Sequence, residues 1–359
     1  MYLTNNYYLS LLKIKRFVEI ALIALFVLIT FNFRLIGYGL SQLNGQLRIV
    51  FHAKPIPAML ADSAVADSVK NKLLVIDEIK KFAVDSLGLK QTKNYTTYYD
   101  QHGKALLMVL SASEKFALKA YQWKFPFLGM VSYKGFFNFK KGEKEKQELN
   151  SMGYDTDYGP TGAWSTLGWF RDPVFSGMLR RNEGQLAELI IHEMTHGTLY
   201  LKNSVDFNEN LASAIGEEGV ERFLKYKFGS PSAELTNYLD GKDDYDRYSA
   251  HILRGATALD SLYHSFDELK KNNAEDSILK LNEKRKLILQ IVSALDTVTF
   301  HHPEKYHALF SENRLPNNAY FMNFKRYDAQ KDEMKKQLHE IFNADIKKYL
   351  DFLKKEPVK

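Results

Sequence analysis

Two histidines and a glutamate occur together at residues 192–196, in the order His-Glu-Met-Thr-His. Residues four apart lie on one face of an α-helix, so the imidazoles of His192 and His196 can bind one metal ion. Glu193 lies beside them and can reach a water molecule on that metal. The pattern predicts a zinc centre with Glu193 as a general base. The alternative is a pair of histidines with a structural role only.

A zinc centre of this kind needs a third protein ligand and a position left open for water. Position 202 is Lys, which excludes the class of zinc site whose third histidine comes six residues after the motif. Two carboxylates, Asp206 and Glu209, remain at suitable spacing. We expect Glu209 to be the ligand, because residues 202–204 are turn-like and Asp206 suits the N-cap of the next helix.

A further carboxylate, Glu217, comes eight residues after Glu209 and falls on nearly the same helix face. It is the substitute ligand, or an acceptor that orients a histidine ring. The other interpretation of Glu217 and Glu218 is an ordinary solvated acidic face.

Composition limits the remaining possibilities. The chain has 359 residues, 45% of them hydrophobic and 13% aromatic, which is enough for a substantial core. It has no cysteine, so a zinc site must use histidine and carboxylate ligands. The net charge is +6, but lysine alternates with glutamate in stretches such as 140–146, which indicates a solvated helix face and no nucleic-acid partner. The basic excess fits an anionic membrane surface or a soluble basic protein equally well.

The amino terminus carries an apolar run at 17–33, preceded by Lys13, Lys15 and Arg16. This pattern predicts a transmembrane signal anchor over 17–40, with a cytoplasmic tail at 1–16. A juxtamembrane segment would follow at 41–60, and an extracytoplasmic domain at 61–359. A cleaved signal peptide is the competing interpretation, but residues 32–36 lack the small side chains that cleavage needs. A buried core helix is the third.

The order of the expected elements predicts an α+β fold, with a small sheet followed by a mainly helical C-terminal half. We expect strands at 95–99 and 105–112, joined as a hairpin around Gly103, and further strands at 129–137 and 163–170. Helices are expected at 37–54, 62–87, 113–122, 142–152, 183–202, 207–228, 244–271, 275–298 and 326–354.

Several sequence blocks resemble one known family. They lie at 45–47, 133–137, 164–170, 172–173, 192–196, 207–209 and 317–319. In these blocks, and over most of the chain from about residue 37, the sequence is similar to the predicted zinc aminopeptidases of Gram-negative bacteria. The most specific parts are Ser-Thr-Leu-Gly-Trp-Phe at 165–170 and the paired His-Glu-x-x-His and Asn-Glu segments.

The resemblance implies a zincin-like peptidase with one Zn²⁺ per chain, bound by His192, His196 and Glu209, and with Glu193 as the base. It implies a small mixed sheet packed on the metal-binding helix, with an edge strand at 161–170 that binds extended peptide. The residues expected to bind substrate are Trp164, Ser165, Thr166, Leu167, Gly168, Asn317 and Asn318. Core packing is the alternative for Trp164, and turn capping is the alternative for the two asparagines.

Three features depart from the family pattern. The chain has no cysteine for lipidation, and Ser213 stands where related zinc sites often carry an acidic residue. No motif that binds a free peptide amino terminus is evident. The resemblance implies an aminopeptidase, and the missing motif leaves a zinc endopeptidase of the same fold, or a non-catalytic membrane-anchored peptide-binding zincin, as alternatives.

Peptide hydrolysis also needs a donor for the oxyanion that develops on the substrate. Tyr327, Tyr248 and His251 are the candidates, each with a structural role as the alternative. His301 and His302 are expected at the surface, because adjacent side chains diverge. The expected location is the inner membrane, single-pass, with the catalytic domain on the periplasmic side. The expected partners are a peptide substrate and the membrane.

Overall fold

The protein is described here by a computed structural model, and its chain divides into two compact units, Met1–Phe51 and His52–Lys359. The described residues are 2–125, 129–161, 171–202, 204–267, 274–311, 314–328 and 331–355. The first unit is helix α1 (Tyr2–His52), whose one non-helical residue is Asn32, with φ −116° and ψ 16°. Within these ranges, no helix is both long enough and apolar enough to cross a bilayer. The anchor at 17–40 therefore gains no support from the structure and stays a prediction.

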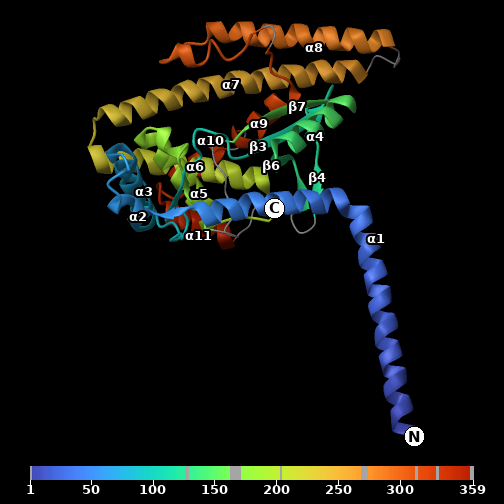
Figure 1. The fold of residues 1–359 in the computed structure, drawn as a ribbon. Coiled ribbons are helices and arrows are strands. Elements are labelled where there is room, and N and C mark those ends of the chain that lie inside the picture. The colour runs from blue at the N-terminus through green and yellow to red at the C-terminus, as the bar shows by residue number, and fades with distance from the viewer. Residues whose placement is uncertain are drawn as a thin grey trace. The chain divides into compact units, whose positions relative to one another are not determined.

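The largest sheet of the second unit has the order β6-β3-β7 (Figure 1). Its central strand, β3 (Met108–Glu114), pairs antiparallel with β6 (Tyr133–Phe136) and with β7 (Tyr154–Pro160). Helices α4 (Phe139–Ser151) and α9 (Asn318–Asp328) pack against this sheet.

Two smaller sheets complete the β structure of the described chain. The first has the order β1-β2-β8. In it β2 (Thr97–Tyr99) pairs antiparallel with β1 (Lys54–Pro55) and parallel with β8 (Val174–Phe175). The other joins β4 (Trp123–Phe125) to β5 (Gly129–Val131). The α+β class and the small mixed sheet are thus confirmed.

Helices dominate the rest of the second unit. Before the sheets come α2 (Ile56–Ala61) and α3 (Asp67–Asp85), and after them α5 (Glu183–Thr198), α6 (Val205–Phe228), α7 (Ala233–Asp267), α8 (Ala274–Ala294), α10 (Lys331–Glu340) and α11 (Ile346–Lys355). Short 3-10 turns lie at Met178–Arg180, Leu295–Thr297 and Pro303–Lys305. The long helices α7 and α8 lie side by side (Figure 1). A cluster of buried apolar residues joins them to α9, including Ile252, Leu259, Ile288 and Phe321.

Three predicted elements are wrong. Strands β2 and β3 belong to different sheets, so no hairpin turns at Gly103. Residues 113–122 do not form a helix: Tyr121 N donates to Ala112 O at 2.8 Å, and Ser113 Oγ donates to carbonyls inside the turn, which replaces helical hydrogen bonding. The single helix at 326–354 is instead α9, α10 and α11. Between α10 and α11 the helical conformation is interrupted at Asn343 and Ala344, which both adopt positive φ. The strand expected at 163–170 lies entirely outside the described residues.

The closest helix packing is between α5 and α6. Gly219 of α6 faces α5, and a Cβ atom placed there would lie 2.8 Å from Leu87 Cδ1 and 3.0 Å from Ile191 Cδ1. At Gly216, one turn earlier, the same position would lie 3.6 Å from His192 Cβ. The two glycines therefore let α6 approach the face of α5 that carries the histidines.

A buried carboxylate joins α6 to two other helices. Glu217 is 6% exposed and accepts from Lys331 Nζ at 2.8 Å and Lys335 Nζ at 3.0 Å, both on α10. Lys242 Nζ of α7 lies 3.3 Å away. Burial alone would raise the pKa of Glu217, but the three lysines outweigh it and hold the pKa below its usual 4.5. These ion pairs connect α6 to α7 and to α10.

We expect Gly219→Val to destabilise the second unit by about 1–3 kcal/mol, because the added side chain overpacks a filled contact. Gly241→Val on α7 is the control, since no atom lies within 4 Å of a Cβ at that position. The free energy of unfolding, measured with urea, should fall only in the first variant. Equal stability of the two would contradict the packing described here.

We expect Glu217→Gln to cost about 3–5 kcal/mol at neutral pH, because it removes the buried carboxylate charge that three lysines share. The pKa of Glu217 is depressed in the folded protein, so its stabilisation is present above pH 4.5 and lost as the pH falls. The difference between wild type and variant should therefore shrink in acid. Glu221→Gln removes an exposed pair with Lys225 and should change stability by less than about 1 kcal/mol. A loss that does not depend on pH would contradict the assignment.

Candidate metal centre

Helix α5 begins with a capping box and buries one face. The Asn182 side chain accepts from Gln185 N at 2.9 Å, and Gln185 Oε1 accepts from Asn182 N. This satisfies amide groups that a helix start leaves without partners. Five apolar residues then enter the core, namely Leu186, Ala187, Ile190, Ile191 and Met194. The main contacts of α5 are with α3, α6 and α7, whereas the resemblance implied a sheet against this helix.

The loop between α5 and α6 is closed by Asn208. Its Oδ1 accepts from Leu201 N at 2.8 Å and its Nδ2 donates to Leu201 O at 2.7 Å. Asn208 is 1% exposed, so both bonds are shielded from water. The next residue, Glu209, is thereby held on the first turns of α6, facing the end of α5.

Three potential ligand atoms meet between the two helices. The Nε2 atoms of His192 and His196 lie 3.1 Å apart, and Glu209 Oε2 lies 3.4 Å and 3.7 Å from them. In a tetrahedral zinc site, bond lengths near 2.1 Å place neighbouring ligand atoms about 3.4 Å apart. In the described part of the chain, no other group of histidine and carboxylate side chains converges in this way. The donor set and its spacing therefore fit one zinc ion.

The charges at the site favour an ionised carboxylate. Burial would raise the pKa of Glu209, but the neighbouring imidazoles of His192 and His196 lower it to about 2. Burial would lower the pKa of His196, but Glu209 raises it above its usual value. A carboxylate that stays ionised at neutral pH is what a divalent cation requires.

Two buried polar atoms at the site have no hydrogen-bond partner among the residues that the structure describes. They are Glu193 Oε2 and His196 Nδ1. A buried carboxylate oxygen without a partner is costly unless a ligand or solvent uses it. Glu193 thus carries the unused acceptor that a general base needs. Among the described residues, no carboxylate accepts a hydrogen bond from His196 Nδ1, so nothing there replaces the acidic residue expected at the position of Ser213 for this ring.

The other carboxylates considered as ligands are engaged elsewhere. Asp206 lies inside the first turn of α6 and Ser204 is the N-cap residue, so the capping role predicted for Asp206 is wrong. Glu217 is held by three lysines. Glu218 accepts from Arg222 and from His339. The prediction of a merely solvated acidic face is wrong for Glu217, which is buried.

The two asparagines expected to bind substrate are used by the fold. Asn318 is fully buried; its Nδ2 donates to Glu114 O at 2.8 Å and its Oδ1 accepts from Tyr263. Asn317 Nδ2 donates to Thr156 O, and its Oδ1 accepts from Tyr320 N in a capping bond. These contacts are structural and leave no side-chain amide of Asn318 for a substrate.

Two of the three oxyanion donors expected from the sequence, Tyr248 and His251, make contacts in the helical core of α7, α8 and α9. Tyr248 lies in the α7–α8–α9 core, and its hydroxyl is 2.5 Å from that of Tyr320. His251 is 8% exposed, and its Nε2 lies 2.8 Å from Ile291 O. The Tyr327 side chain lies outside the described part of the chain.

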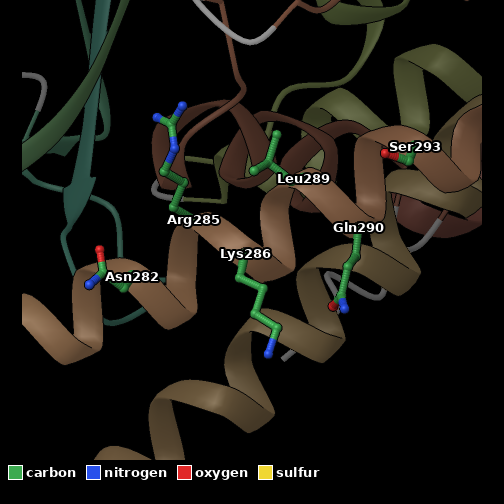
Figure 2. Close-up of a pocket in the computed structure, with 6 residues that line it drawn as sticks. All are labelled: Asn282, Arg285, Lys286, Leu289, Gln290 and Ser293. Carbon is green, nitrogen blue, oxygen red and sulfur yellow. The ribbon is translucent and has the colours of Figure 1, made fainter.

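The remaining residues singled out in the sequence either make contacts elsewhere or are not described by the structure. Trp164, Ser165, Thr166, Leu167 and Gly168 are among the residues that the structure does not describe. His301 and His302 pair with the carboxylates of Asp243 and Asp244. A shallow pocket on α8 holds none of the predicted residues (Figure 2); it is lined by Asn282, Arg285, Lys286, Leu289, Gln290 and Ser293.

Two tyrosines near the site were missed by the sequence analysis. The ring of Tyr200 meets that of His196 edge-on, with centroids 6.0 Å apart. Burial, and then the charge of Glu209, raise the pKa of Tyr200. Tyr200 lies beyond the end of α5 at Thr198, so helical spacing does not explain its position next to His196. Burial, and then the charge of Glu193, raise the pKa of Tyr95. No motif in the sequence marks this residue.

Comparison with known proteins supports the resemblance noted in the sequence. A family model described as "Putative aminopeptidase" matches residues 37–356. Searches of curated proteins and of solved structures returned no match. The matched range includes the metal-binding group and every expected substrate-binding residue. The chain therefore belongs to the putative aminopeptidase family.

Proposed function

We propose that the protein is a zinc metallopeptidase, and that it acts as an aminopeptidase. One observation carries the proposal: two imidazole nitrogens and a carboxylate oxygen converge at the spacing of zinc ligands, beside the buried carboxylate of Glu193. Family membership supports peptide hydrolysis at a coarse level.

Each residue would contribute a separate part of the chemistry. His192, His196 and Glu209 would hold the ion. Zinc, when bound, supplies an activated water and polarises the scissile carbonyl. Glu193 would accept the proton of that water and pass it to the leaving amine. Of the two carboxylates among these four residues, Glu209 would bind the ion and Glu193 would not.

Two alternatives differ from this proposal in specificity or in chemistry. A zinc endopeptidase would use the same four residues and cleave internal peptide bonds. A non-catalytic peptide-binding protein would keep the metal without needing a base. The retention of Glu193, with a buried acceptor atom that lacks a described partner, favours the two enzymes.

Location is a separate proposal that rests on the sequence pattern alone. The basic residues before the apolar run at 17–33 favour an anchor in the inner membrane with the second unit in the periplasm. We expect the full chain to stay with the membrane fraction in alkaline carbonate, and a chain lacking residues 1–40 to be released. Release of the full chain would contradict the anchor.

We expect Glu193→Gln to keep zinc and to lower kcat by about 10²–10⁴-fold, because it removes the base and keeps the ligands. Glu209→Gln should instead weaken zinc binding by more than about 100-fold. The loss of a direct zinc ligand lowers the affinity more than the loss of a residue that only orients a ligand. Zinc content and hydrolysis of amino-acid amides and internally quenched peptides are measured together. Glu221→Gln on α6 is the control and should change neither.

The two substrates separate the alternatives. Cleavage of amides alone supports the aminopeptidase, and cleavage of the quenched peptides alone supports the endopeptidase. Zinc binding by the wild type without hydrolysis of either substrate would overturn the enzyme proposal and leave the peptide-binding alternative.

A further inference from the structure

One ring nitrogen of His196 lacks the support that a metal-binding histidine usually has. Such a histidine binds the ion through one ring nitrogen and donates through the other to a carboxylate, a carbonyl or water, which fixes the direction of the ring. Nε2 of His196 faces His192 and Glu209. Its Nδ1 is buried and has no hydrogen-bond partner among the residues that the structure describes. Within those residues, packing must therefore do what a hydrogen bond usually does.

Two aromatic rings pack against the imidazole of His196. The ring of His192 meets it at 85°, with centroids 4.8 Å apart. The ring of Tyr200 meets it at 69°, with centroids 6.0 Å apart. Both contacts are edge-to-face, at separations that aromatic pairs favour. His192 is itself a candidate ligand, so Tyr200 supplies a contact from outside the ligand set.

The backbone is fixed on both sides of Tyr200. Before it, Leu199 N donates to Thr195 O at 2.9 Å. After it, Leu201 is held through its N–H and its carbonyl by the side chain of Asn208, at 2.8 Å and 2.7 Å. A side chain between two fixed neighbours has few backbone arrangements left to lose. It can therefore stay against the histidine at a small entropic cost.

Tyr200 is also partly open to solvent. It is 42% exposed, whereas the side chain of His196 is 7% exposed. Part of the phenol thus packs on the imidazole and the rest reaches the surface. Substitutions at Tyr200 therefore change the contact with His196 and leave the buried core of α5 in place.

We propose that Tyr200 is a positioning residue for His196. Its ring packs edge-to-face on the imidazole and keeps Nε2 directed toward His192 and Glu209, in place of the hydrogen bond that usually orients such a ring. The ring carries this effect, so the phenol hydroxyl is dispensable for metal binding. The inference rests on the zinc centre of the proposed function, and it does not require hydrolysis.

The test measures the zinc affinity of the full chain by competition with a chromogenic chelator. Tyr200→Leu removes the ring and should weaken zinc binding by about 3- to 10-fold, which is the usual contribution of an aromatic pair. Tyr200→Phe keeps the ring and should stay within about twofold of the wild type. Tyr226→Leu on α6 is the matched control: Tyr226 is 67% exposed and its ring centroid lies 5.3 Å from that of Phe82. It should keep the wild-type affinity.

A second measurement reports the ring contact itself in metal-free protein. With the histidine rings labelled with ¹³C, His196→Gln identifies the His196 resonance among those of the ten histidines. Tyr200→Leu should shift that resonance, because it removes the ring current of the neighbouring phenol. Tyr200→Phe should shift it less, and Tyr226→Leu should leave it in place.

The outcomes separate the inference from the proposed function. If Tyr200→Leu binds zinc as tightly as the wild type, or if Tyr200→Phe loses as much affinity as Tyr200→Leu, the inference is overturned and the proposed function is untouched. A His196 resonance unmoved by Tyr200→Leu also overturns it. If the wild type binds zinc but hydrolyses neither substrate, the enzyme proposal fails and the affinities still decide the inference. A wild type that binds no zinc overturns both. Weaker binding confined to Tyr200→Leu, with a shifted resonance, supports the inference.

Discussion

The candidate metal centre depends on how closely α5 and α6 approach each other. Its ligand atoms come from both helices, and Gly216 and Gly219 are the positions at which no side chain keeps the helices apart. A Cβ at Gly219 would already collide with Leu87 and Ile191. The spacing of two nitrogens and one oxygen is therefore a consequence of backbone packing, and the imidazoles need only ordinary helical geometry to meet Glu209.

Residues that form the site and residues that hold it in place alternate along α6. Asn208 closes the loop and its neighbour Glu209 faces the histidines. Gly216 admits α5, and its neighbour Glu217 joins α6 to α7 and α10 through lysines. Adjacent residues of a helix point in different directions, so one helix can present a ligand on one side and be anchored on another.

Local patterns predicted which three candidate ligands come together, and long-range contacts limited the rest. The spacing of His192, His196 and Glu209 within two helices could be read directly, because helical periodicity fixes it. Strand pairing could not: β2 pairs with β8, about 75 residues later, and nothing in either short strand specifies that partner. The buried state of Glu217 depends on Lys331 and Lys335, more than a hundred residues away. The backbone of Tyr95 is likewise hydrogen-bonded to a residue distant in sequence, because Tyr95 N donates to Asp172 O. The Asn317–Asn318 pair binds the carbonyl groups of Thr156 and Glu114, which lie far away in the sequence and which no local pattern indicates.

The short loop between α5 and α6 also bears on how the protein is assembled. All three ligand side chains lie within 192–209, so bringing them together closes only a short stretch of chain and costs little entropy. Pairings such as that of β2 with β8, by contrast, join segments distant in sequence, and contacts of this kind are expected to form more slowly. In the proposed metallopeptidase, zinc present during synthesis would find its ligands in a helical hairpin before the remaining layers dock, and its binding energy would favour that early species over misfolded competitors.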